Sequence, residues 1–206
     1  MAEESTPTDD RPLQAAIALH EGGDVDAAER AYRGLLGGPF ATDAQHLLGV
    51  VAHQRGAHQR AVELIEAAIE LNGSVAWYWA NLAEALRALG LRQRALEAVE
   101  RALELDGNLA AAWNNKGLLL QAFGAHLDAA ACFDAAAQMA PESGEPLNNL
   151  GNLESEQGRF EAARAAYRGA IARSPARADW WRHLSIVTRF EHGDDPELQR
   201  MLALSS

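Results

Sequence analysis

The chain has 206 residues and a formal net charge of −11, from 18 basic and 29 acidic side chains. Alanine, the strongest helix former, occupies 43 positions, whereas valine, isoleucine and threonine, which favour strands, together occupy 16. This composition predicts an all-α fold. The acidic balance repels phosphate and no basic stripe offsets it, so we expect no binding to nucleic acid or to an anionic membrane surface.

Three further features concern the setting of the protein. No apolar run approaches the roughly 18 residues that span a bilayer. Residues 1–10 have neither the basic nor the apolar segment of a signal peptide. The single cysteine, Cys132, excludes an internal disulfide and a metal site of the CxxC type. We therefore expect a soluble cytoplasmic protein.

In chain order, residues 1–8 are expected to be a disordered tail, and a repeat begins soon after them. Stepping by 34 from Gly56 gives further glycines, and the same step from Ala61 or Ala68 gives further alanines. A step of 33 back from Gly56 gives Gly23. A fixed period of this length predicts stacked copies of one structural unit. The matching columns are Gly56, Gly90, Gly124 and Gly158; Ala61, Ala95, Ala129 and Ala163; and Ala68, Ala102, Ala136 and Ala170.

Each copy has the pattern of two helices. The first contains a Trp/Leu/Gly signature, as in Trp113–Gly117, and the glycine column supplies the turn after it. The second places small residues around a large one, as Ala129, Phe133 and Ala136 do, so that one helical face can pack closely on its neighbour. A helix-stop pair such as Ala140-Pro141 ends the copy.

The period and these residues resemble the tetratricopeptide-repeat (TPR) pattern. The resemblance implies an all-α fold, a right-handed α-solenoid of stacked helix-turn-helix units with a C-terminal capping helix. It also implies that the first helices line a concave groove. The repeats cover residues 9–177 as five units, at about 9–41, 42–75, 76–109, 110–143 and 144–177. Residues 178–206 are expected to be a partial sixth unit and the capping helix.

The segment after residue 192 departs from the repeat. Asp195 and Pro196 have the pattern of an N-cap and a first-turn proline, and Leu198, Met201 and Leu202 would give the new helix one apolar face. Residues 190–201 resemble the segment that joins TPR units to the catalytic domain in bacterial TPR-sulfotransferases, a domain that the 206 residues do not include. This resemblance implies an alternative function, an accessory subunit that presents substrate to a separate transferase of the sulfotransferase or glycosyltransferase kind.

The sequence contains none of the common catalytic motifs. It has no P-loop, GxGxxG, GxSxG, HExxH or EF-hand pattern, so we expect a protein that is not an enzyme and has no catalytic residue and no cofactor. The only lysine, Lys116, is expected to pack its stem between helices and keep its amine in solvent. Cys132 is expected to be a small buried apolar residue rather than a redox group.

Three histidines leave two interpretations open. His20 and His53 are 33 positions apart, the step that relates the first two units, so we expect them to be neighbours. His46 lies two turns before His53 on the same face. Three imidazoles on one wall could bind a transition metal. The alternative, which we favour, is a pH-sensitive or merely solvated cluster, and we assign no metal site.

Asparagines recur on the first helices at the same period. Their amides could simply join neighbouring helices, or each could offer a donor and an acceptor to a peptide backbone. A comparable asparagine ladder holds peptides in the superhelical TPR domains of O-linked N-acetylglucosamine transferases, and this resemblance favours peptide binding. The candidate peptide-binding residues are Asn81, Asn115 and Asn149, flanked by Asn114, Asn148, Asn152, His183, Leu118 and Val50.

The sequence thus predicts a non-catalytic scaffold for protein–protein interaction. Its partner would be an extended peptide or a helix of another protein, held in the groove of the first helices. The two-lysine clamp by which chaperone-binding TPR proteins hold a terminal carboxylate has no counterpart here, since the chain has one lysine. The sequence leaves the oligomeric state open.

Overall fold

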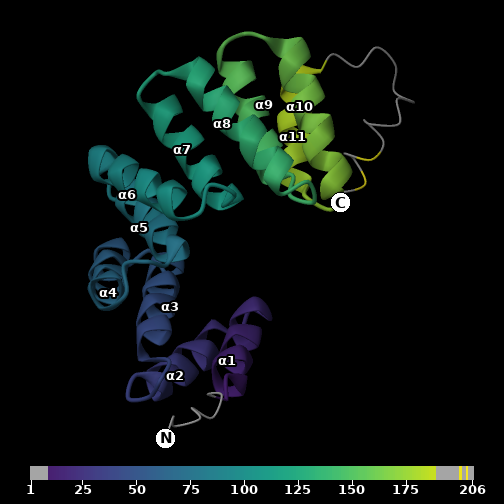
Figure 1. Ribbon diagram of the computed structural model, residues 1–206. Coiled ribbons are helices and arrows are strands. Elements are labelled where there is room, and N and C mark those ends of the chain that lie inside the picture. Colours follow the sequence, from purple (N-terminus) through teal and green to yellow (C-terminus); the bar gives the residue numbers. More distant parts are fainter. Residues whose placement is uncertain (1–8, 189–199, 201–202, 204–206) are drawn as a thin grey trace, which may run out of the picture. The chain divides into compact units, whose positions relative to one another are not determined.

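The computed structural model describes residues 9–188 together with residues 200 and 203. Within them the regular structure consists of eleven α-helices (Figure 1), as the composition predicts. The chain divides into two compact units, Met1–Leu105 (unit 1) and Asp106–Ser206 (unit 2). Unit 1 contains α1 (Arg11–Glu21), α2 (Val25–Leu35), α3 (Ala41–Gln54), α4 (His58–Leu71), α5 (Ala76–Ala88) and α6 (Arg92–Leu105). Unit 2 contains α7 (Ala110–Ala122), α8 (His126–Met139), α9 (Glu145–Glu156), α10 (Phe160–Arg173) and α11 (Ala178–Val187).

Unit 1 is built from three helix-turn-helix pairs. In each pair a short turn joins a first helix, the A helix, to a second, the B helix: α1 to α2, α3 to α4 and α5 to α6. The B helix of one pair also packs on the A helix of the next. Leu13, Ala28, Tyr32, Ala44 and Val51 belong to one buried cluster formed by the first three helices. No single pair could enclose these apolar side chains, so the stacking of pairs creates the core.

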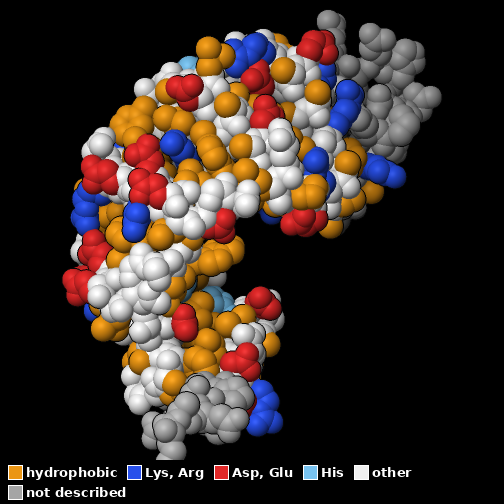
Figure 2. Space-filling model, in the orientation of Figure 1, with side chains coloured by type: hydrophobic (Ala, Val, Ile, Leu, Met, Phe, Trp, Pro, Cys, Tyr) orange, Lys and Arg blue, Asp and Glu red, His pale blue; other side chains and the backbone are white. Residues whose placement is uncertain are grey.

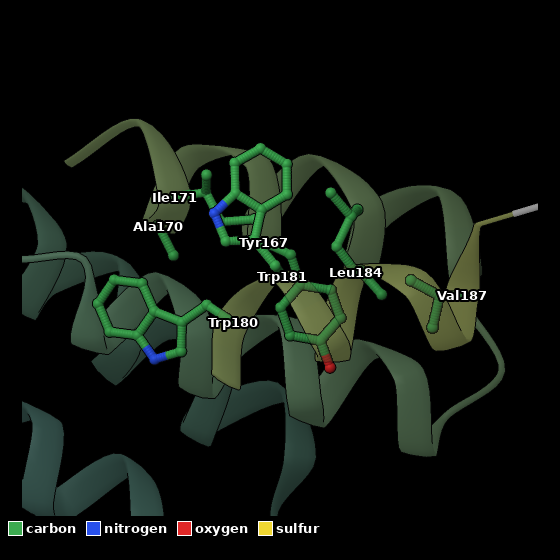
Figure 3. Packing of buried hydrophobic residues seen from close by; sticks show 8 residues of the cluster. Tyr167, Ala170, Ile171, Trp180, Trp181, Leu184 and Val187 are labelled. Atoms are coloured by element: carbon green, nitrogen blue, oxygen red, sulfur yellow. The ribbon is translucent and has the colours of Figure 1, made fainter. Parts of the chain in front are cut away.

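Unit 2 has two such pairs, α7 with α8 and α9 with α10, and the single helix α11 after them. α11 packs on α10 and also contacts α9. Its Trp180, Trp181 and Leu184 are buried in a cluster with Tyr167 and Ile171 of α10 (Figure 3). The repeats therefore end in a capping helix, as expected. The further helix predicted to begin at Asp195 lies outside the described residues, as do residues 1–8.

The turn between an A helix and its B helix has the same backbone geometry in every pair. A positive φ, between 71° and 84°, occurs at one glycine per turn, and a side chain would strain the backbone there. This geometry confirms the predicted glycine column. The five glycines are Gly23, Gly56, Gly90, Gly124 and Gly158.

A different set of glycines lets the two helices of a pair approach closely. A Cβ atom built on Gly117 of α7 would lie 2.5 Å from the ring of Phe133 in α8. One built on Gly151 of α9 would lie 2.5 Å from the ring of Tyr167 in α10. Gly49 has the same relation to Ile65 in the second pair. A side chain at these positions would push the B helix away, so the absence of a Cβ atom sets how closely the helices pack.

Tryptophans attach the loop between two repeats to the following A helix. Trp79, Trp113 and Trp181 each donate the indole N–H to a backbone carbonyl oxygen six residues earlier, at 2.8–2.9 Å. An indole N–H finds a partner of this kind when most of the ring is removed from water. The recurrence of tryptophan in this column is thereby explained by loop anchoring.

The surface carries charges of both signs. On the face shown in Figure 2, arginines are interspersed with acidic side chains. Several form local pairs along one helix, such as Arg60–Glu63 on α4 and Arg101–Glu104 on α6. Among the described helices, none combines the length and the apolar character needed to cross a membrane.

We predict that Gly117→Ala destabilises the protein by about 1–3 kcal/mol, because the new methyl group overlaps the fully buried ring of Phe133. Urea denaturation followed by far-UV circular dichroism measures the change. Gly34→Ala in α2 is the matched control, because nothing lies within 4 Å of the added Cβ atom. That change should be neutral or stabilising by up to about 1 kcal/mol. Equal effects of the two substitutions would contradict the conclusion that the lack of a Cβ atom at Gly117 lets α7 and α8 pack closely.

Candidate functional site

A cavity of about 370 Å³ opens on the A-helix side of unit 2. α7, α9 and α11 supply most of its lining and α10 supplies one tyrosine. The lining combines amides, apolar side chains and a single carboxylate. Its residues are Leu118, Gln121, Asn149, Asn152, Ser155, Glu156, Tyr167, His183 and Ile186.

The repeat explains why these residues meet. α9 contacts both α7 and α11, so the three A helices lie next to one another. Residues one period apart on adjacent A helices therefore lie side by side. Leu118, Asn152 and Ile186 form one such column, and Asn149 and His183 belong to another. The cavity is thus a product of the period rather than of one loop.

Hydrogen bonds between neighbouring A helices join residues 35 positions apart. Asn149 Nδ2 donates to Asn114 Oδ1 at 3.0 Å, and Gln121 Nε2 donates to Glu156 Oε2 at 2.7 Å. Asn148 Oδ1 lies 2.9 Å from His183 Nδ1. The two residues of each bond are one position further apart in the sequence than the period, because the side chain reaches the residue next to its period equivalent on the adjacent helix. The amides therefore do join the helices, the first of the two roles considered for them.

Burial separates the asparagines into two groups. Asn114, Asn115 and Asn148 are only 7–9% exposed. Amides buried to this degree have to be hydrogen-bonded, and a ligand at the surface has little access to them. Asn149 and Asn152 are half-buried and line the cavity. These two are the asparagines of unit 2 that a ligand can contact.

Each of these two amides uses one of its groups within the protein. Asn149 gives an amide hydrogen to Asn114, and Asn152 accepts from the hydroxyl of Tyr167 at 2.9 Å. An asparagine side chain has a carbonyl acceptor and two amide hydrogens. The described contacts therefore leave the carbonyl oxygen of Asn149 and the amide group of Asn152 for another partner. The two residues are three positions apart on α9 and share one face.

The cavity carries little charge near neutral pH. Burial lowers the pKa of His183, so its ring is neutral there. Burial likewise raises the pKa of Tyr167. Glu156 is exposed at the rim and is the one carboxylate of the lining. A ligand of this site would be recognised mainly by neutral hydrogen bonds and apolar contact.

The remaining candidate residues, Asn81 and Val50, belong to unit 1. Asn81 is hydrogen-bonded to the buried His46, with 2.9 Å between Asn81 Nδ2 and His46 Nε2. The His46 ring stacks on Tyr78 at 4.3 Å between ring centroids, and the Tyr78 hydroxyl donates to Asp43. Val50 is half-buried on α3. Asn81 is thus part of a local network that also joins two A helices.

Each of the three candidate histidines has hydrogen-bond partners of its own. His20 bonds Gln54 and Tyr32, at 2.8 and 3.2 Å, and His46 bonds Asn81. His53 lies against His58, with 3.1 Å between their Nδ1 atoms. The described residues contain no group of three His, Cys, Asp or Glu side chains placed to hold a metal ion. One hydrogen bond of His20 goes to Gln54, the residue after the one that the 33-residue step relates to it.

Cys132 is buried in α8, as predicted. Burial raises the pKa of its thiol, which disfavours the reactive thiolate. The thiol therefore acts as a small apolar side chain of the core.

Five lining residues escaped the sequence interpretation: Gln121, Ser155, Glu156, Tyr167 and Ile186. A period step from Leu118 through Asn152 reaches Ile186, and a step from Gln121 reaches Ser155. These columns contain different residue types, so a search for identical residues passes over them. Tyr167 comes from a B helix, and its period column contains core residues.

The family model of the tetratricopeptide repeat matches residues 13–76, 81–144 and 148–189. These ranges cover well over half of the chain, so the protein belongs to the tetratricopeptide-repeat family. Proteins of this fold generally mediate protein–protein interactions. No curated protein matches the chain at a significant level, and the resemblance of residues 190–201 to a sulfotransferase linker is not shown.

Solved TPR structures share the fold. TTC0263, a thermophilic TPR protein in Thermus thermophilus, is 22% identical over 86% of this chain and 97% of that chain, with a TM-score of 0.77. YrrB, a TPR protein with an unusual peptide-binding site, is 22% identical over 83% and 89% of the two chains, with a TM-score of 0.58. A chain of the Cut9–Hcn1 hetero-tetramer of the APC/C is 18% identical over 94% of this chain and 39% of that chain, with a TM-score of 0.80. At these identities the likeness shows the fold alone.

We predict that stability falls as the pH drops from about 6.5 to about 4. Burial lowers the pKa of His46 to about 4 in the folded chain, whereas the unfolded chain takes up this proton near its ordinary pKa of about 6.5. The unfolded state therefore binds more protons in this window, and unfolding becomes easier by about 3 kcal/mol at its acid end.

Urea denaturation at several pH values, compared between the wild type and His46→Gln, isolates this contribution. The wild type should lose more stability than His46→Gln over the window. A His58→Gln control should keep the wild-type dependence, because it retains His46. Parallel curves for the wild type and His46→Gln would contradict the assignment.

Proposed function

We propose that this protein is a non-catalytic scaffold and that unit 2 binds an extended peptide segment of a partner protein on its A-helix side. The binding site is the cavity lined by Leu118, Asn149, Asn152, His183 and Ile186. The observation that carries the proposal is that the described contacts use one group of each amide on α9 and leave the carbonyl oxygen of Asn149 and the amide hydrogens of Asn152 for a ligand. This acceptor and this donor complement the N–H and C=O of one residue in an extended peptide, which point the same way.

The apolar part of the lining supports the same ligand. Ile186 is 75% exposed on α11 although it borders a cavity, and Leu118 contributes a second aliphatic side chain from α7. Aliphatic side chains of the peptide would cover these residues and remove their surface from water, which is favourable by about 25 cal/mol per Å² of apolar area. Backbone bonds would thus give affinity, and the apolar contact would favour one residue type.

The buried amides would take a positioning role in this proposal. Asn114 orients Asn149, and Asn148 orients His183, through the bonds between adjacent A helices. Asn115 lies in the buried group, and Asn81 and Val50 belong to unit 1. The proposal does not require any of these three. The alternative function, substrate presentation to a transferase, rests on residues 190–201, of which only Arg200 is described, and no contact of the described residues favours it.

We predict that Asn149→Ala/Asn152→Ala weakens peptide binding by about 5- to 100-fold, since each neutral hydrogen bond contributes roughly 0.5–1.5 kcal/mol. The ligand is a peptide selected from a displayed random library on the full-length chain, and calorimetry measures its affinity. Asn108→Ala, which removes an exposed amide of unit 2 outside the cavity, should have no effect. An unchanged affinity in a folded double variant would mean that the peptide binds outside this cavity.

A second prediction locates the partner directly. A photoreactive p-benzoylphenylalanine in place of Ile186 should crosslink to the bound peptide upon irradiation, because this side chain is exposed at the cavity. The same group in place of Leu127, which is 83% exposed on α8 and outside the lining, is the control. Mass spectrometry of the digested adduct identifies the crosslinked position. Equal crosslinking at both positions would contradict the site.

A further inference from the structure

A second cavity, of about 450 Å³, lies in unit 1 between α2, α3 and α4. α3 contributes Gln45, Leu48, Val51 and Ala52 at the spacing of one helix face, and Arg55 follows directly after the helix. Val50, the groove residue expected on α3, does not belong to it. The cavity therefore uses another side of the A helix than the predicted peptide groove, together with two B helices.

The cavity borders the end of a short B helix. α2 has 11 residues, whereas α4 has 14, which makes α2 about 4.5 Å shorter. The chain after Leu35 continues as Leu36-Gly37-Gly38-Pro39, a sequence that cannot prolong the helix. Leu36, directly after the end of α2, lines the cavity.

The floor of this cavity is apolar. Leu48 and Val51 of α3 are 8% and 1% exposed, and Leu64 of α4 is half-buried beside them. Leu36 is 40% exposed at the opening. Leu36 and Leu64 are the larger apolar side chains of the lining that keep exposed surface, and an aliphatic side chain of a ligand could pack on these two. The volume is within the range of small ligand sites.

The rim is rich in arginine. Arg33 and Arg55 both form ion pairs with Glu29, the one carboxylate of the lining, and Arg55 also pairs with Asp26. Arg60 pairs with Glu63 at 3.0 Å. The side chains of Arg33 and Arg60 are 61% and 63% exposed. Exposed pairs of this kind contribute little, so a carboxylate of a ligand can share or replace their acceptors.

Guanidinium groups are suited to this exchange. Each has five N–H donors in a planar fork, and the internal ion pairs use only some of them. The lining contains three arginines and one carboxylate, Glu29. Asp26 and Glu63, which pair with Arg55 and Arg60, lie outside the lining. Arginine therefore predominates among the charged side chains of the lining itself, which favours acidic ligands over basic ones.

We propose that this cavity is a docking site for an acidic segment of a partner protein. An aliphatic side chain of the segment packs on Leu36 and Leu64, and flanking carboxylates bind Arg33, Arg55 and Arg60. The proposal goes beyond the peptide-binding function of unit 2, because it concerns other helices and a negatively charged ligand rather than neutral backbone groups. The two sites also differ in their response to salt, since ion pairs matter at this one only.

Fluorescence anisotropy on the full-length chain tests the proposal with three labelled short peptides whose ends are blocked. The first contains one leucine flanked on each side by aspartates, the second has lysines in place of the aspartates, and the third has serine in place of leucine. The acidic leucine peptide should bind, and its affinity should fall at least about tenfold when NaCl is raised from about 50 to about 300 mM. The lysine and serine peptides should bind at least about tenfold more weakly.

Charge reversal locates the site. Arg33→Glu/Arg60→Glu should weaken the acidic peptide at least about tenfold, and Arg60→Gln should weaken it by a smaller factor while leaving the fold intact. Arg101→Glu is the matched control, because Arg101 forms the same kind of pair, with Glu104, outside the cavity. This control should change the affinity by less than about twofold.

Three results would overturn the proposal. The first is equal binding of the lysine peptide or of the serine peptide. The second is an unchanged affinity in the folded Arg33→Glu/Arg60→Glu variant. The third comes from sedimentation: a dimer that this variant dissociates and that the acidic peptide leaves intact would mean that the cavity serves contact between two copies of the chain.

Discussion

The contact between a glycine of an A helix and a large side chain of its B helix is the constraint on which three of the five described helix pairs depend, whereas the small residues Ala16 and Ala83 hold the same position in the other two. Gly49 faces Ile65, Gly117 faces Phe133, and Gly151 faces Tyr167, and in each pair a Cβ atom would overlap the large side chain. The contact sets the distance between the two helices. It thereby also sets where the next A helix can pack, because that helix rests on the preceding B helix. The lining of the unit 2 cavity is fixed by this regular spacing.

Close packing of A helices has a consequence for polar residues. An amide between two helices is removed from water and has to find a partner inside the protein. The repeat meets this requirement by placing polar residues on neighbouring helices 35 positions apart, as in Asn114–Asn149 and His46–Asn81. An asparagine column is therefore consistent with a structural role. Peptide binding needs amide groups beyond those that the helices use, and in unit 2 the described contacts leave such groups on Asn149 and Asn152.

The two cavities differ in position and in chemistry. The cavity of unit 2 lies on three regularly stacked A helices, and its lining is almost uncharged near neutral pH. The cavity of unit 1 borders the end of the short helix α2, and its lining includes three arginines around apolar side chains. One chain of this family thus has two cavities with different linings on the same scaffold of helix pairs.

The sequence by itself determined the fold, because the 34-residue period, the turn glycines and the alternation of small and large residues are local requirements of backbone and helix packing. It also placed Leu118, Asn149, Asn152 and His183 on A helices, whose stacking brings these four residues to one cavity. The tertiary structure decided which side-chain groups meet. A period places Cα atoms, but a hydrogen bond also depends on side-chain direction and burial. Only the packed structure therefore separates buried Asn148 from accessible Asn149, brings Tyr167 to Asn152, and gives His20, His46 and His53 different partners.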